Sequence, residues 1–63
     1  MKASVEFLKD EIVKAHNELN RKMKLFIKAE TDLDKFAWNI EVKSLELRIE
    51  LLEKHFKLEL HRL

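Results

Sequence analysis

Apolar side chains recur every three or four positions through the first half of the chain, which predicts one amphipathic helix over about residues 4–29. At about 100° per residue these positions stay on one face of the helix. Ser4 precedes the pattern as a candidate N-cap, and Glu6 lies in the first turn, where a negative charge suits the helix dipole. The apolar face consists of Val5, Leu8, Ile12, Ala15, Leu19, Met23 and Phe26.

The pattern breaks near residues 30–34. Thr31 stands three residues before Asp34, an arrangement that resembles a capping box and marks the start of a helix. We therefore expect a turn at about residues 30–33 and a second helix over about residues 32–63, folded back on the first as an antiparallel hairpin. The alternative is one unbroken helix of about 90 Å, at a rise of about 1.5 Å per residue.

The second helix carries two apolar stripes whose centres lie about 160° apart on a helical wheel. The Leu33 stripe consists of Leu33, Phe36, Ala37, Ile40, Leu47, Leu51 and Leu58. The Trp38 stripe consists of Trp38, Val42, Leu45, Ile49, Leu52, Phe56 and Leu63, with Leu60 beside it. A helix that is apolar on two opposite sides needs two partners, and a hairpin supplies one. We therefore predict a hairpin that self-associates, most simply as a homodimer forming a four-helix bundle or coiled coil, with the Trp38 stripe at the interface between chains.

Between residues 40 and 60 the apolar positions also alternate in places, as they would in a β-strand. Leu, Glu, Lys and Arg dominate this stretch, and these residues are strong helix formers. No Asn-Gly or Asp-Gly turn separates the would-be strands. We therefore favour the helix and assign the chain to the all-α class, with a single domain over residues 1–63.

The composition excludes further classes of fold and of binding site, because the 63 residues include no glycine, proline or cysteine. Phosphate-binding loops, dinucleotide fingerprints and hairpin-rich β domains need glycine, and disulfide frameworks and thiolate metal sites need cysteine. Charged residues make up 40% of the chain, yet the net charge is only +1, so no overall field draws it to nucleic acid or to an anionic membrane. No apolar run exceeds three residues, whereas a bilayer span takes about 20. We expect no membrane association and a cytoplasmic location.

One face of the first helix is basic. Lys14, Arg21, Lys24 and Lys28 recur at heptad spacing opposite the apolar face, and between residues 14 and 28 the one acidic residue is Glu18. Such a basic stripe could follow a nucleic-acid backbone or an acidic partner helix. It also has a simpler explanation, because cations in the second half of a helix complement its dipole and keep an outer face hydrated.

Candidate chemistry is sparse. His16, His55 and His61 do not converge in an antiparallel hairpin that turns near residue 31, and His55 with Glu59 offers only two corners of a metal site. None of the three hydroxyl residues stands beside a histidine in the sequence. We therefore predict no catalytic residue, no metal and no cofactor. A pH-sensitive histidine contact at an interface remains an alternative.

These patterns favour a non-enzymatic protein-interaction module: an adaptor, regulator or assembly subunit that works as a homo-oligomeric helical bundle. Its first partner would be a second copy of itself, and another helical protein is a further candidate. One alternative is a small RNA- or DNA-binding bundle that uses the basic stripe. Another is an artificial or library-derived bundle without an evolved partner, although conventional design usually places glycine at helix ends.

Overall fold

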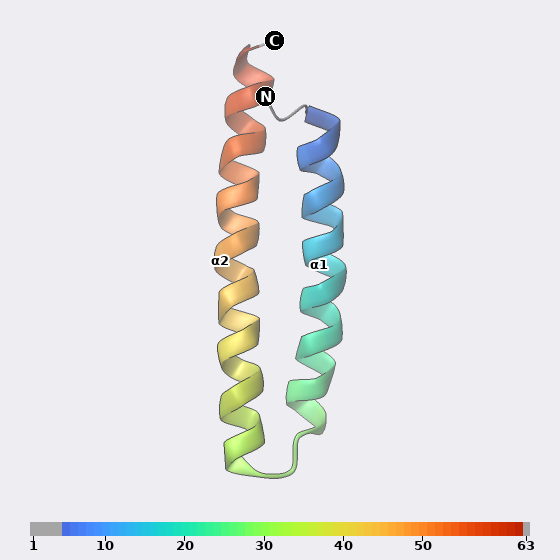
Figure 1. Cartoon of the computed structure of the whole chain (residues 1–63), viewed down its shortest axis with the longest axis vertical. Coiled ribbons are helices and arrows are strands. Elements are labelled where there is room, and N and C mark those ends of the chain that lie inside the picture. The colour runs from blue at the N-terminus through green and yellow to red at the C-terminus, as the bar shows by residue number, and fades with distance from the viewer. Residues whose placement is uncertain (1–4, 63) are drawn as a thin grey trace.

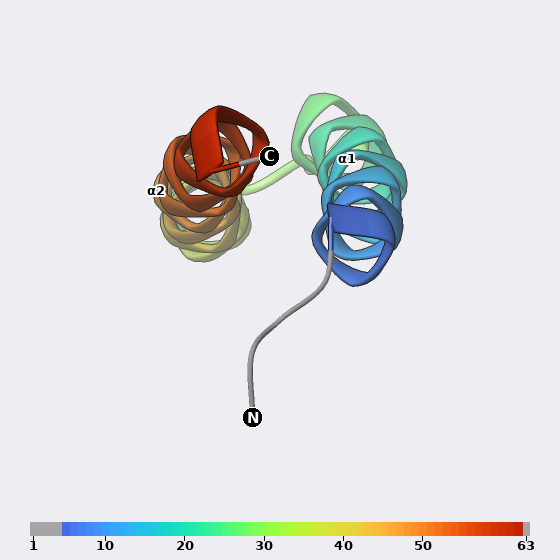
Figure 2. The same ribbon diagram turned by 90° about the horizontal axis from the view of Figure 1, so that it is seen from above.

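The computed structural model describes residues 5–62, which form two α-helices joined by a short turn. Helix α1 covers Val5–Lys28 and helix α2 covers Asp32–Arg62. The two helices run in opposite directions and lie side by side in both views of the ribbon (Figures 1 and 2). The longest dimension is 48 Å, about half the length of an unbroken helix. The predicted all-α hairpin is therefore confirmed, and the single continuous helix is ruled out.

The turn is held by hydrogen bonds to ordinary residues. The Ala29 amide donates to the Phe26 carbonyl at 3.2 Å and closes the last turn of α1. The Asp34 amide then donates to Thr31 Oγ1 at 3.1 Å, and the Lys35 amide donates to the Thr31 carbonyl at 3.0 Å. Thr31 is thus the N-cap of α2, as the sequence predicts. Ser4, the N-cap expected for α1, lies outside the described residues.

This turn needs no glycine because it uses no left-handed backbone. Among residues 5–62 no residue has a positive φ, the conformation for which glycine is normally required. The break between the helices therefore comes from the hydroxyl cap of Thr31 and from the packing of the two helices. The chain can omit glycine altogether and still reverse direction.

The core is a single row of side chains between the helices. Within the described part of the chain, Leu8 and Ala15 of α1 are buried against Val42, Leu45 and Ile49 of α2. Half-buried residues extend the row toward both ends: Val5, Ile12, Leu19, Leu25, Trp38, Leu52 and Phe56. Neither helix of the described chain is both long and apolar enough to cross a membrane.

Three ion pairs join α1 to α2 along the edges of this core. Lys22 Nζ lies 3.0 Å from Glu41 Oε2, and Arg48 Nη2 lies 3.7 Å from Glu11 Oε2. His16 Nε2 lies 3.6 Å from Glu53 Oε1 and forms an ion pair only when the imidazole is protonated. These pairs lie beside the face of α2 that is turned toward α1.

Candidate interaction surface

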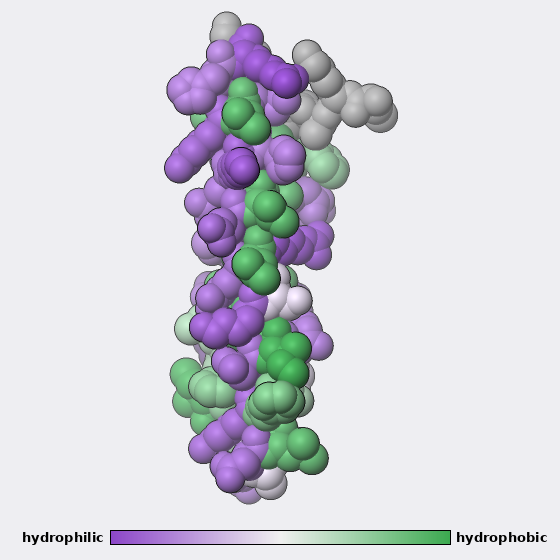
Figure 3. Space-filling view, turned by 90° about the vertical axis from the view of Figure 1, so that its left-hand side faces the viewer, coloured by the Kyte–Doolittle hydropathy of each residue, from purple (hydrophilic) through white to green (hydrophobic). Residues whose placement is uncertain are grey.

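The Leu33 stripe lies on the side of α2 that faces away from α1. Its six large side chains are exposed, from 51% for Leu58 to 76% for Leu33. The space-filling view of this side shows a column of hydrophobic atoms along most of the helix, broken by polar residues (Figure 3). The six residues are Leu33, Phe36, Ile40, Leu47, Leu51 and Leu58. Isolated apolar residues are common on protein surfaces, but a row of six on one helix face is typical of an interaction site.

The Trp38 stripe, which the sequence led us to place between chains, lies instead between α1 and α2 of the same chain. Val42, Leu45 and Ile49 are only 5–9% exposed, and Trp38, Leu52 and Phe56 are half-buried. Leu63, the last member expected at that interface, lies outside the described residues. The structure therefore keeps the two apolar faces of the second helix but reverses their assignment. The face left for another molecule is the Leu33 stripe.

A difference in continuity explains this choice. From Trp38 to Phe56 every core position of the Trp38 stripe is apolar, with a spacing that alternates between four and three residues. The Leu33 stripe is interrupted by Ser44 and Lys54. Turning that stripe toward α1 would bury the Lys54 ammonium, which costs free energy unless the charge is paired. The uninterrupted stripe is therefore the better partner for α1, and the sequence contains this signal.

The basic stripe of α1 is partly neutralised by its own helix. Lys14 Nζ lies 3.8 Å from Glu11 Oε1, and Arg21 donates a hydrogen bond to Glu18. That bond, together with the charges of Arg21 and Lys22, holds the pKa of Glu18 below its usual value. Lys24 and Lys28 are exposed, and neither makes an ion pair within the part of the chain that the structure describes. Two of the four candidate nucleic-acid contacts are thus already paired with carboxylates.

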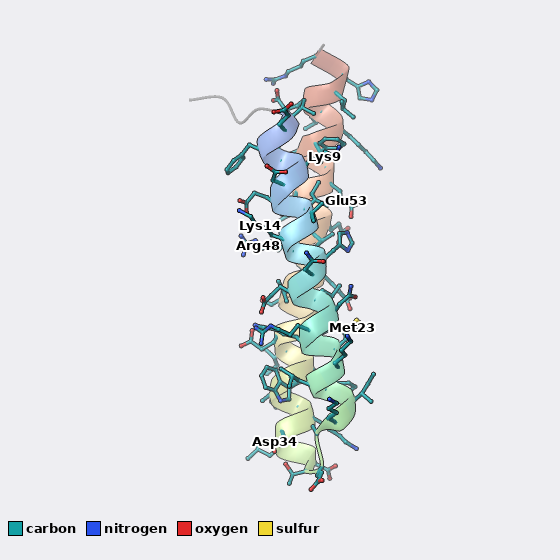
Figure 4. All side chains as sticks on the ribbon, turned by 90° about the vertical axis from the view of Figure 1, so that its right-hand side faces the viewer. Lys9, Lys14, Met23, Asp34, Arg48 and Glu53 are labelled. Carbon is teal, nitrogen blue, oxygen red and sulfur yellow. The ribbon has the colours of Figure 1, made fainter. Side chains whose placement is uncertain are left out.

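Two open grooves follow the lines where α1 and α2 meet, and they differ in character. Figure 4 shows Lys14 and Arg48 on one side of α1 and Glu53 on the other. The first groove is mainly charged and is lined by Glu11, Lys14, Glu18, Lys22, Glu41 and Arg48, with Ala15, Ser44 and Leu45. The second, near the open end of the hairpin, is more apolar and is lined by Val5, Ile12, Val13, Phe56 and Leu60, with Lys9, His16, Glu53 and Lys57.

The histidines do not come together. His16 faces Glu53 across the hairpin, whereas His55 and His61 are exposed on the far half of α2. Among residues 5–62 no three carboxylate or imidazole groups lie close enough to hold a metal ion. The exposed apolar face of α2 is therefore the candidate functional surface of the described residues.

The comparisons with known proteins add no identity to this description. No protein-family model matches the sequence, and neither a curated protein nor a solved structure matches it.

Proposed function

We propose that this protein is a non-enzymatic interaction module, which acts by associating with itself through the Leu33 stripe of α2. The observation that supports the proposal is the row of six large apolar side chains on the outer side of α2, each more than half exposed. A single chain of 63 residues buries little apolar surface by itself, so a second copy is an effective source of further burial.

The free energy available at this face is of the same order as the cost of association. Complete burial of one Leu, Ile or Phe side chain contributes roughly 1.5–3 kcal/mol, and about half of that remains to be gained by side chains that are half exposed. Six such residues from each of two chains therefore offer roughly 9–18 kcal/mol. Association costs on the order of 4–15 kcal/mol in lost translational and rotational freedom.

Sedimentation equilibrium tests the proposal. We expect the wild-type protein to be a dimer at micromolar concentration, and the double variant Leu47→Asp/Leu51→Asp to be a monomer that keeps its helical circular dichroism spectrum. Both substitutions place a charge on the outer side of α2 and leave the buried core untouched.

Val13→Asp is the matched control, because Val13 is a 52% exposed apolar residue on α1 rather than on α2. This variant should remain dimeric. A wild-type protein that stays a folded monomer throughout the micromolar range would overturn the proposal.

A further inference from the structure

We infer that two copies pair through the outer faces of their α2 helices in an antiparallel arrangement, with the two-fold axis near residue 49. The inference rests on the proposed self-association and goes further, because it fixes the direction, the register and the position of the two helices. Its evidence lies in the order of residues along the exposed face.

The exposed positions of α2 form a heptad seam, which we call the α2 seam. Successive members are separated alternately by four and three residues, the spacing that keeps one face of a helix against a neighbouring helix. The seam lies on the side of α2 opposite the Trp38 stripe (Figure 3). Its members are Leu33, Ala37, Ile40, Ser44, Leu47, Leu51, Lys54, Leu58 and His61.

The α2 seam matches itself when the second copy runs in the opposite direction. With the axis near residue 49, Leu47 of each copy lies opposite Leu51 of the other, and Ile40 lies opposite Leu58. The two polar interruptions of the seam then also meet, since Ser44 lies opposite Lys54 and its hydroxyl can accept a hydrogen bond from the ammonium group. The large apolar residues in the middle of the seam thus face apolar ones, and Ala37 lies opposite His61.

The charges along the edges of the seam do not decide the direction of pairing. With the axis near residue 49, Lys43 of one copy lies opposite Lys57 of the other, and Glu50 lies opposite its own counterpart. A parallel pair would likewise set Lys43 against Arg48. Like charges face each other in both arrangements, so the direction rests on the match within the seam.

A parallel pair in register is disfavoured within the seam itself. Each residue of the seam would then meet its own counterpart, so the two Lys54 ammonium groups would face each other. Like charges held together in this way act against the parallel arrangement.

The paired hairpins are consequently flat. Because the α2 seam lies opposite the face that holds α1, the four helices are arranged in the order α1, α2, α2, α1, with the two α2 helices in the middle. This differs from a bundle with a square cross-section, in which every helix contacts two others around a common core. The two grooves between α1 and α2 remain accessible in each copy.

Disulfide cross-linking tests both the direction and the register of pairing, and the sequence has no native cysteine that could form other cross-links. Ser44→Cys and Lys54→Cys chains should cross-link when mixed, and neither should cross-link when alone. Two copies of position 44 would lie about 15 Å apart along the helix axis, whereas a disulfide needs Cα atoms within about 7 Å. Self-linking of either single variant overturns the inference. A monomeric wild-type protein would instead remove the proposed function itself, so the two failures are distinguishable.

Discussion

Both sides of α2 are apolar, but one side is buried in the folded chain and the other is exposed. On the side toward α1, Val42, Leu45 and Ile49 are almost completely buried. On the other side, Leu33 and Leu47 leave most of their surface in contact with solvent. An apolar face needs a partner on whichever side of the helix it lies. Which of the two faces packs against α1 depends instead on whether its row of apolar residues is uninterrupted.

The edges of the two sides reinforce the contrast. Ion pairs that join α1 to α2, such as Lys22 with Glu41, lie along the buried side. The ion pair between Lys43 and Glu46, at 3.9 Å beside the exposed face, stays within α2. The buried side of α2 thus contacts α1 through both packing and ion pairs. The charged groups beside the exposed side remain accessible to another molecule.

The largest expected effect comes from placing a charge on each side in turn. Ile49→Asp should unfold the protein, because the loss of a buried side chain and the burial of a carboxylate together cost at least about 4 kcal/mol. A domain this small rarely has more than about 3–5 kcal/mol of stability. Far-ultraviolet circular dichroism measures the loss of helix.

Leu51→Asp is the matched substitution on the exposed side, where the same chemistry should leave the helical spectrum in place. If Leu51→Asp unfolds the chain as completely as Ile49→Asp does, the two sides are energetically equivalent. The comparison between them would then fail.

The second largest effect on stability is expected at the N-terminus of α2, which belongs to both sides of the helix. Thr31→Ala removes the oxygen that accepts a hydrogen bond from the Asp34 amide and should cost about 1 kcal/mol. For a domain of this size that loss corresponds to a fall in Tm of roughly 4–8 °C, measured by thermal denaturation. Thr31→Ser retains the acceptor and should stay close to the wild-type Tm. An equal fall in both variants would show that the hydroxyl cap does not stabilise α2.

A smaller difference is expected between the coupling free energies of the ion pairs on the buried and the exposed side of α2. A double-mutant cycle with Lys22→Met and Glu41→Gln should give a coupling free energy near the upper end of about 0.2–1 kcal/mol, because the Lys22 side chain is only 19% exposed. The cycle for Lys43 and Glu46 should give about 0.3 kcal/mol or less, because the Lys43 side chain is 67% exposed. Urea denaturation measures both, and equal couplings would contradict the distinction.

The smallest expected effect is the contribution of the lowered Glu18 pKa to stability. Glu18 belongs to α1 and lies away from both sides of α2. The Glu18 pKa is lowered by the hydrogen bond from Arg21 and by the nearby charges of Arg21 and Lys22. Since the folded-state pKa lies below that of the unfolded chain, the carboxylate favours folding above the unfolded-state pKa. This contribution is lost as the pH falls through the folded-state pKa.

Nuclear magnetic resonance titration of Glu18 provides the measurement. Arg21→Gln should raise the Glu18 pKa toward its usual value, whereas Arg48→Gln, which removes the partner of Glu11 on α2, should leave it unchanged. A Glu18 pKa that does not move in Arg21→Gln would contradict the assigned cause.

The local features of this fold are the ones that the sequence predicts well. The two helices, their reversal and the cap at Thr31 depend on spacing and residue type within a few positions, and all of these are visible along the chain. The assignment of the two apolar stripes was harder, because both stripes are strongly hydrophobic and only the interruptions at Ser44 and Lys54 separate them.

Ion-pair partners were less predictable for a related reason. Acid and base spaced four residues apart on one helix, such as Glu18 and Lys22, are the expected local pairs. In the structure Lys22 reaches Glu41 on the other helix, and Glu18 pairs with Arg21 instead. The choice depends on which side of α2 faces α1, and this information is not present in the spacing of charges along one helix.

The turn has a consequence for how this sequence can change over generations. Because no described residue relies on a positive φ, the backbone conformation at residues 29 and 30 does not restrict these positions to glycine. Position 31 is different, since its side-chain oxygen caps α2. Relatives of this chain should therefore vary freely through the turn while retaining Thr, Ser, Asp or Asn at that single position.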